Sequence, residues 1–273
     1  MRTIALATAS CLLLFAGCSS ETAADPPDAA AASDTTSPVS EESDRQPACF
    51  NPHGGECLGP LEAGTYETSV FTPALRYTVP GGWVNAEDLP GNFLLHRAQD
   101  GQEGIRGGSY IGVWSGIRAS SADDDCPEEA QAGVGTSPEE LVAWFRSRPG
   151  LRVTRPKRVE VGGLDGLAVD ITLRKGYRST CPWSEGHPAV PLIIGSGISH
   201  LYHVVLPGLT VRLVFLSWGE TNVTIEITSV HEQLAAQRYF AITAPIVDSF
   251  EFAHDGRQAN RAPAASYGRG PGY

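Results

Sequence analysis

The sequence lacks the usual signatures of a catalytic or nucleotide-binding site. A Gly-x-Ser-x-Gly motif is absent, and the nearest serines, Ser109 in "GGSYIG" and Ser196 in "GSGISH", do not fit it. No Gly-x-Gly-x-x-Gly or phosphate-loop pattern occurs either, which argues against the common nucleotide sites. We therefore expect a protein that is not an enzyme and carries no cofactor. A serine–histidine–carboxylate triad assembled only in space is the alternative, because triads are defined by geometry.

Lysine is nearly absent, since Lys157 and Lys175 are the two lysines among 20 basic residues. Arginine in its place, together with abundant alanine, glycine and proline, indicates a GC-rich genome. The formal net charge is −11. The part expected to fold is itself acidic and shows no basic stripe that would neutralise phosphates, so we expect no nucleic-acid partner.

Residues 1–17 have the order of a bacterial export signal, with a basic start, an apolar core and small residues at the cleavage point. The core is too short to span a bilayer, which needs about 20 residues. Ala16 and Gly17 followed by Cys18 resemble a lipobox, in which the freed cysteine receives lipid. We expect acyl chains such as palmitate on Cys18 and a protein anchored on the extracytoplasmic face of the cell membrane. Ordinary secretion with an incidental Cys18 is the alternative.

Two segments have too few apolar residues to fold. Residues 18–48 contain the predicted lipidated cysteine and a run of Ser, Thr, Ala, Asp, Glu and Pro, so we expect a disordered acidic tether. Residues 254–273, rich in Gly, Pro and Ala, are expected to form a disordered tail. A single globular domain, residues 49–253, remains, and this is a size at which one core is common.

The domain contains an even number of cysteines, which is typical of disulfides in an exported protein. They are Cys49, Cys57, Cys126 and Cys181. Zinc is the rival interpretation, but no Cys-x-x-Cys pair occurs and the spacings match no common zinc finger. Of the three possible pairings, we favour Cys49 with Cys57 and Cys126 with Cys181.

Apolar and polar residues mostly alternate within the domain, as in β-strands joined by Gly-, Asp- and Asn-rich hairpin turns. The alternating runs are 75–79, 153–161, 167–173, 209–218 and 222–230. A helix is predicted after Ser137, which precedes Pro138 and stands three residues before Glu140, as in a capping box. A second helix, over residues 231–249, should be interrupted near Pro245. The predicted fold class is therefore α+β, a twisted antiparallel sheet with one or two packed helices.

Three polar motifs contain residue types that could form a metal or modification site. His200 and His203 fall on a predicted strand, where residues three apart face opposite sides, so we expect satisfied or exposed histidines and no shared metal. The acidic run 123–125, followed by Glu128 and Glu129, lacks the spacing of a calcium loop and is interpreted as a solvated loop. Asn222 begins a glycosylation sequon, which we interpret as a chance match in an exported bacterial protein.

The stretch "YTVPGGW", residues 77–83, joins an alternating run to two glycines. Pro80 removes a ladder hydrogen bond, and Gly81 and Gly82 permit the dihedral angles of a sharp turn. No capped helix follows, as a phosphate cradle would require. We therefore predict a strand corner, with Trp83 folded back onto the core.

Several segments in a fixed order carry a resemblance to known proteins. They are "AGTYETSVFTPALRYTVPGGW", "SPEELVAWFRSRPGLRVTRPKRVEVGGLDGLAVDITL", a "P-x-V-P-L" turn at residues 188–192 and "IVDSFEF". This order resembles exported actinobacterial lipoproteins of unassigned function and is similar to the PsbP-like fold of LpqN-type lipoproteins. The resemblance covers nearly all of residues 58–253 and contains no catalytic signature. It implies an architecture and a location, and proteins of that fold serve as binding or assembly factors.

These observations together favour a non-catalytic lipoprotein of the cell envelope. Its membrane contact would be the lipid on Cys18, and its domain would bind an envelope protein, a lipid or a small ligand. An envelope hydrolase with an unrecognised active site is the alternative.

Overall fold

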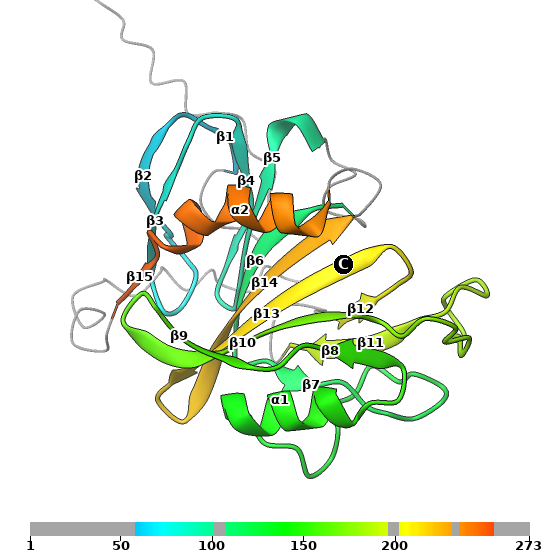
Figure 1. Cartoon of the computed structure of the whole chain (residues 1–273). Helices are drawn as coiled ribbons and strands as arrows, with labels where there is room; N and C mark the ends of the chain where they lie inside the picture. The colour runs from blue at the N-terminus through cyan, green and yellow to red at the C-terminus, as the bar shows by residue number, and fades with distance from the viewer. Residues whose placement is uncertain (1–57, 101–107, 196–201, 231–234, 254–273) are drawn as a thin grey trace, which may run out of the picture. The chain divides into compact units, whose positions relative to one another are not determined.

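The structure is a computed structural model that describes residues 58–100, 108–195, 202–230 and 235–253 (Figure 1). All of these residues lie within one compact unit, Arg45–Tyr273. The predicted export signal, tether and tail, together with Cys18, Cys49 and Cys57, lie outside the described residues. Within the described ranges, no helix is long and apolar enough to cross a membrane.

The largest sheet is antiparallel and has nine strands among the described residues. Its main path runs β1 (Gly59–Leu61), β4 (Trp83–Leu89), β5 (Asn92–Arg97), β6 (Tyr110–Ser115), β14 (Thr221–Val230), β13 (Leu209–Trp218), β10 (Leu164–Leu173) and β8 (Leu151–Val153), and β9 (Lys157–Val161) also pairs with β10. The expected hairpins β9–β10 and β13–β14 are confirmed. They turn at Gly162-Gly163 and at Gly219, where positive φ angles require glycine. The predicted α+β class is therefore confirmed.

Residues 153–161, predicted as one strand, form two. β8 ends at Val153 and β9 begins at Lys157, because Pro156 has no N–H to donate to the ladder. Thr154 bridges the break: its N–H donates to the carbonyl of Asp170 at 3.0 Å, and its hydroxyl accepts from the N–H of Asp170 at 2.8 Å. Both short strands therefore stay on the same edge of β10.

One face of the large sheet is covered by α2 (Ala236–Val247) and by a small sheet of β15 (Glu251–Phe252), β3 (Leu75–Val79) and β2 (Gly64–Glu67) (Figure 1). The core on this side includes the buried rings of Tyr77, Phe93 and Phe240. The predicted interruption of the second helix at Pro245 is wrong, since α2 continues to Val247. Pro245 is exposed and lies in the last turn, so the single backbone bond that it cannot make is lost two residues before the helix ends.

The opposite face is covered by α1 (Pro138–Ser147) and by a second small sheet of β12 (Tyr202–Val205), β11 (Val190–Ile194) and β7 (Arg118–Ala119). The predicted capping box of α1 is confirmed, because Ser137 and Glu140 bond to each other's backbone N–H groups. Phe145 of α1 is buried and stacks on Phe215 of β13, with ring centroids 5.7 Å apart. The turn predicted at residues 188–192 is wrong in part, since Pro191 and Leu192 belong to β11.

A disulfide joins Cys126 to Cys181, with a Cα–Cα distance of 5.6 Å. This pairing confirms the favoured prediction for these two cysteines. Both are buried and pack with Ala189 in a small cluster of their own, apart from the two large cores. The bond ties the acidic loop before α1 to the segment that follows β10.

The corner predicted at "YTVPGGW" is present between β3 and β4. Tyr77 and Val79 are buried on one side of β3, Gly82 has a φ of +86°, and Trp83 is 3% exposed. The chain therefore passes from the small sheet into the large sheet at this point, and no ligand loop is formed here.

Candidate functional site

A groove lies between α2 and the strands β8, β9, β10 and β13. It has two adjoining parts, with volumes of about 220 and 460 Å³. Thr154 and Asp170 line both parts, so we treat them as one groove. The wall of the smaller part is largely apolar and includes Val159, Val161, Ala168, Val214, Phe240 and Val247.

The alternation of β10 creates the floor of this groove. Val169 and Ile171 are buried in the core on the α1 side. Their neighbours Ala168, Asp170 and Thr172 line the groove on the α2 side. Because alanine is small, Ala168 leaves open volume between the sheet and α2 that a larger side chain would fill.

Arg212 and Asp170 form a rigid charged pair at the middle of the groove. The two residues are direct cross-strand partners on β13 and β10. Nε of Arg212 donates to Oδ1 of Asp170 at 2.6 Å and Nη2 donates to Oδ2 at 3.0 Å. The guanidinium also lies 4.0 Å from the ring centroid of Phe240. The bidentate contact and the stacking on an aromatic face fix the orientation of this arginine.

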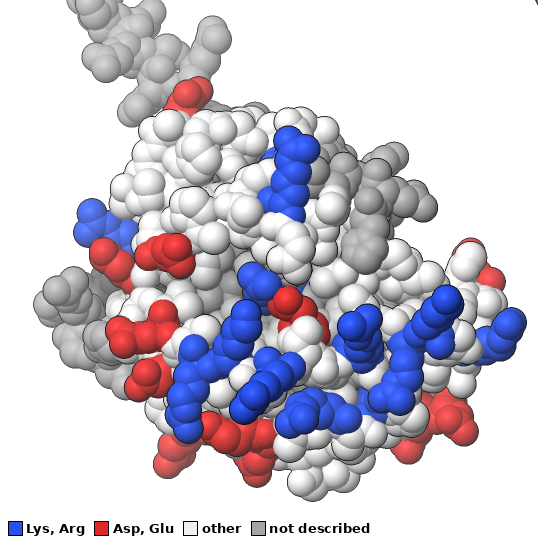
Figure 2. Space-filling view, viewed as in Figure 1, with Lys and Arg blue, Asp and Glu red and all other residues white. Residues whose placement is uncertain are grey.

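Exposed cations gather beside the groove, over β8, β9 and the segments that follow β8 and β10 (Figure 2). We call this group the basic band; it consists of Arg152, Arg155, Lys157, Arg158, Arg174, Lys175 and Arg178. The sequence-based expectation that the folded part has no basic stripe is therefore wrong. The net charge of the whole chain is negative and therefore does not indicate this local excess of cations. The expected lack of a nucleic-acid partner stays a prediction.

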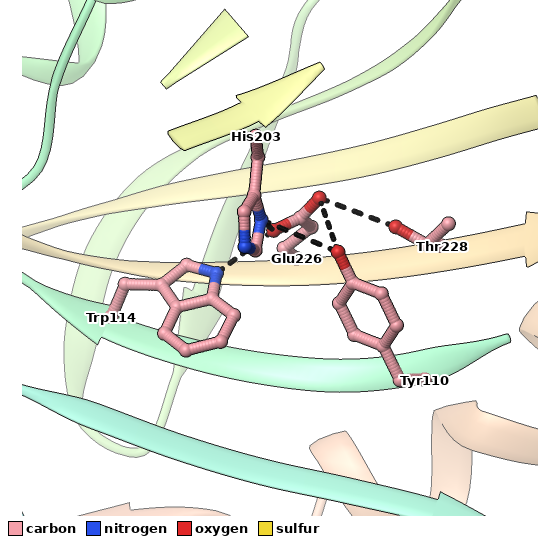
Figure 3. Close-up of polar contacts among 5 residues, drawn as sticks. All are labelled: Tyr110, Trp114, His203, Glu226 and Thr228. Carbon is pink, nitrogen blue, oxygen red and sulfur yellow. Dashed lines mark hydrogen bonds and ion pairs between the residues drawn. The ribbon is translucent and has the colours of Figure 1, made fainter. Parts of the chain in front are cut away.

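A second polar arrangement is buried on the other side of the sheet, around Glu226 of β14 (Figure 3). Oε1 of Glu226 accepts from the Tyr110 hydroxyl at 3.0 Å and from the Thr228 hydroxyl at 3.2 Å. Oε2 accepts from Nε1 of Trp114 at 2.9 Å and also contacts Nδ1 of His203 on β12. Each carboxylate oxygen therefore has two partners.

Burial and these partners act in opposite directions on the pKa of Glu226. Burial favours the neutral acid and raises the pKa, whereas the charge of His203 and the hydrogen bonds from His203, Trp114 and Tyr110 lower it. The partners outweigh burial, so the pKa of Glu226 lies below its ordinary value. Burial and the nearby Glu226 charge raise the pKa of Tyr110 well above its ordinary value, so its hydroxyl remains a donor.

The Glu226 arrangement does not favour the hydrolase alternative. A triad needs a serine or cysteine nucleophile on the histidine, whereas the polar contacts of His203 within the described residues are with Tyr110 and Glu226. Ser109 is buried, and its hydroxyl accepts a hydrogen bond from the N–H of Val230. Ser196 and His200 lie outside the described residues.

The remaining sequence motifs are also placed. The residues of the acidic run 123–125 are largely exposed, which fits the solvated loop expected there. Among the described residues, no group of three or more His, Cys, Asp or Glu side chains is arranged to hold a metal ion. Asn222 is fully buried, and its amide donates to the carbonyls of Ile117 and Thr136. A glycan on Asn222 is incompatible with that burial.

The chain was compared with protein families, curated proteins and solved structures. No protein-family model matches the chain, and no curated protein matches it. Among solved structures, the solution structure of cyanobacterial PsbP from Synechocystis sp. PCC 6803 is 12% identical, with a TM-score of 0.33 over 74% of this chain and 100% of that chain. A crystal structure from Bacteroides thetaiotaomicron VPI-5482 is 11% identical, with a TM-score of 0.31. The match covers 67% of this chain and 46% of that chain, so this chain spans less than half of the Bacteroides protein's length. At these TM-scores, neither likeness bears on ligands or partners.

Sequence reasoning missed the groove, the basic band and the role of Glu226. The band leaves a signal in local charge, because residues 146–178 contain nine basic and three acidic side chains, a net charge of +6. The sequence contains no comparable signal for the burial of Glu226, since a single glutamate in an alternating strand is ordinarily exposed to solvent.

Proposed function

We propose that this protein is a non-catalytic lipoprotein, anchored in the cell envelope through Cys18, whose domain binds a small amphiphilic ligand in the groove beside α2. The observation that carries the proposal is the groove itself, in which an apolar wall adjoins the oriented Arg212–Asp170 pair. Small-ligand sites commonly combine apolar walls with a few well-placed polar groups that fix orientation.

The chemistry of the groove supports a ligand with an apolar body and a polar end. Val159, Val161 and Phe240 offer apolar contact, while Lys157, Arg212 and Asp170 offer charge at the same site. Because Arg212 is held by both Asp170 and Phe240, its position changes little when a ligand binds, and a preorganised group costs less to engage. An envelope lipid or a related amphiphile fits this combination.

The test fills the groove with a side chain. Ala244 of α2 lines the groove and is partly buried, so Ala244→Trp should occupy ligand volume. Ala241, one turn earlier, is exposed, and Ala241→Trp adds the same indole group without being part of the groove lining. We expect native mass spectrometry of the wild type, purified without detergent, to show a bound small molecule. Its occupancy should fall at least several-fold in Ala244→Trp and remain unchanged in Ala241→Trp.

Thermal melts of both variants show whether a loss of occupancy comes from the filled groove or from unfolding. Both variants should unfold cooperatively and close to the wild type, because neither substitution removes a core side chain. A wild type without a bound molecule, or equal occupancy in two folded variants, would contradict the proposal.

A further inference from the structure

We propose that the basic band is a docking surface for an anionic lipid bilayer. This inference rests on the proposed function in one respect: a lipid on Cys18 would hold the domain near a membrane. The surface itself is inferred from the distribution of charge over the described residues, and its test needs no lipid anchor.

Charge in the domain is strongly segregated. The described residues contain 14 Lys and Arg against 20 Asp and Glu, a net charge of −6. Within them, residues 146–178 have a net charge of +6, so the other described residues have a net charge of −12. Nine of the 14 cations of this acidic domain therefore lie in one 33-residue segment, which can attract a negative partner that the rest of the domain repels.

The cations of the band are available to a partner. All seven side chains are exposed, and none of them takes part in an ion pair within the described part of the chain. Arg212 differs, because Asp170 already neutralises it. Seven unpaired like charges in one region repel each other, and an anionic surface relieves that repulsion.

The strand register directs part of the band over the groove. Arg152 of β8 is the partner of Thr172, and Lys157 of β9 is the partner of Ala168. Both β10 residues line the groove, and cross-strand partners share a face of the sheet, so Arg152 and Lys157 border its opening. A phosphate bound by these cations would lie at the entrance to the apolar wall, as a lipid headgroup does when its chain is directed inward.

The exposed aromatic content favours a bilayer over single-stranded nucleic acid. Nucleic-acid grooves combine cations with several aromatic platforms on which bases stack. Among the described residues, Trp183 is the exposed large hydrophobic side chain, at 43%. It lies five residues beyond Arg178 in the chain, and tryptophan is enriched at membrane interfaces.

The experiment uses the chain from residue 19 onward, which lacks both the predicted signal and Cys18 but retains the whole compact unit Arg45–Tyr273. Its co-sedimentation is measured with vesicles of phosphatidylcholine alone and with vesicles that contain phosphatidylglycerol. We expect binding that needs phosphatidylglycerol and that is largely lost at about 1 M salt, where the screening length is roughly 3 Å.

Two double variants with the same change in net charge provide the control. Arg155→Glu with Arg158→Glu reverses two exposed charges of the band, and neither residue lines the groove. Arg118→Glu with Arg238→Glu reverses two exposed charges on β7 and α2. Each cation near an anionic surface favours partitioning by roughly five-fold. The band variant should therefore lose at least about tenfold in partition coefficient, whereas the control variant should change less than about threefold.

Several outcomes would overturn the proposal. Equal binding to both kinds of vesicle, or equal losses in two folded double variants, would show that the band is not the docking surface. Tighter binding of a single-stranded DNA oligonucleotide at the same salt concentration, abolished in the band variant, would assign the band to nucleic acid instead. None of these outcomes depends on the occupancy of the groove in Ala244→Trp, so the two proposals can fail separately.

Discussion

Glu226 combines full burial with a complete set of hydrogen-bond partners. Its four partners come from β6, β12 and its own strand, so one carboxylate connects the large sheet to the small sheet that covers it. A buried charge is tolerated when it is paired and hydrogen-bonded in this way. Loss of the carboxylate would leave the buried donors of Tyr110, Trp114 and Thr228 without this acceptor.

We predict that Glu226→Gln destabilises the protein. The amide replaces one acceptor oxygen by a donor, so we expect a loss of roughly 2–4 kcal/mol in the free energy of unfolding at pH 7, because unsatisfied buried groups cost about 1–3 kcal/mol each. Glu251→Gln is the matched control, since Glu251 is exposed and pairs with Arg76 at 3.8 Å. Urea denaturation of the three proteins measures the difference.

The pH dependence of this effect has a definite sign. The pKa of Glu226 is lower in the folded protein than its ordinary value of about 4.5. Its contribution to stability is therefore complete above that value and is lost as the pH falls through the lower, folded pKa. We expect the stability gap between wild type and Glu226→Gln to narrow as the pH falls below about 4.5. A gap that widens in acid would contradict this assignment.

At the scale of elements, the corner between β3 and β4 determines how the small sheet meets the large one. Gly82 carries the turn with its φ of +86°, whereas Gly81 has no positive φ. A side chain at Gly82 would meet open space, so any cost of substitution comes from the backbone rather than from a clash.

We predict that Gly82→Val lowers the melting temperature more than Gly81→Val. A left-handed conformation costs a non-glycine residue roughly 1–2 kcal/mol, and more for a β-branched one. Differential scanning calorimetry of both variants checks the ordering. Equal melting temperatures for Gly82→Val and the wild type would refute the need for glycine at this corner.

The elements with strong local signals could be predicted, and those defined by distant packing could not. The cap of α1, the hairpins and the corner follow from Ser137, Gly219 and Gly82, whose roles depend on adjacent residues. In contrast, β14 alternates apolar residues with Asn222, Thr224, Glu226 and Thr228, which indicates a strand with one solvated face. Both faces are buried, because His203 of β12 contacts Glu226 and the chain around Ile117 and Thr136 contacts Asn222.

The candidate site was less predictable than the fold. The groove exists because α2 packs over Ala168, and Ala168 is separated from α2 by about seventy residues of sequence. No local sequence pattern indicates an open volume between two elements that are so far apart in the chain. The basic band could have been found from the charge of residues 146–178 alone, but the acidic total of the chain hid it.

In the intact protein, the proposed anchor and the basic band would act on the same membrane. A lipid on Cys18 would fix one end of the chain, and residues 19–57 would set how far the described domain can move from it. Binding through an anchor and a surface together is stronger than through either alone, because the second contact is intramolecular.

The anchor itself is tested by metabolic labelling. We expect the intact protein to incorporate radioactive palmitate in its native host, and the label to be lost in Cys18→Ala, because the freed cysteine receives the lipid. Globomycin, which blocks lipoprotein signal cleavage, should cause a heavier labelled precursor to accumulate. Equal labelling of the wild type and Cys18→Ala would exclude the anchor.

The large sheet separates two hydrophobic cores, one against α2 and one against α1. Local opening in proteins follows such packed units, and each unit has its own free energy of opening. If the groove binds a ligand as proposed, only the packing against α2 would have to loosen when the ligand enters. The core against α1, which lies across the sheet and includes the side of Glu226, would keep its contacts.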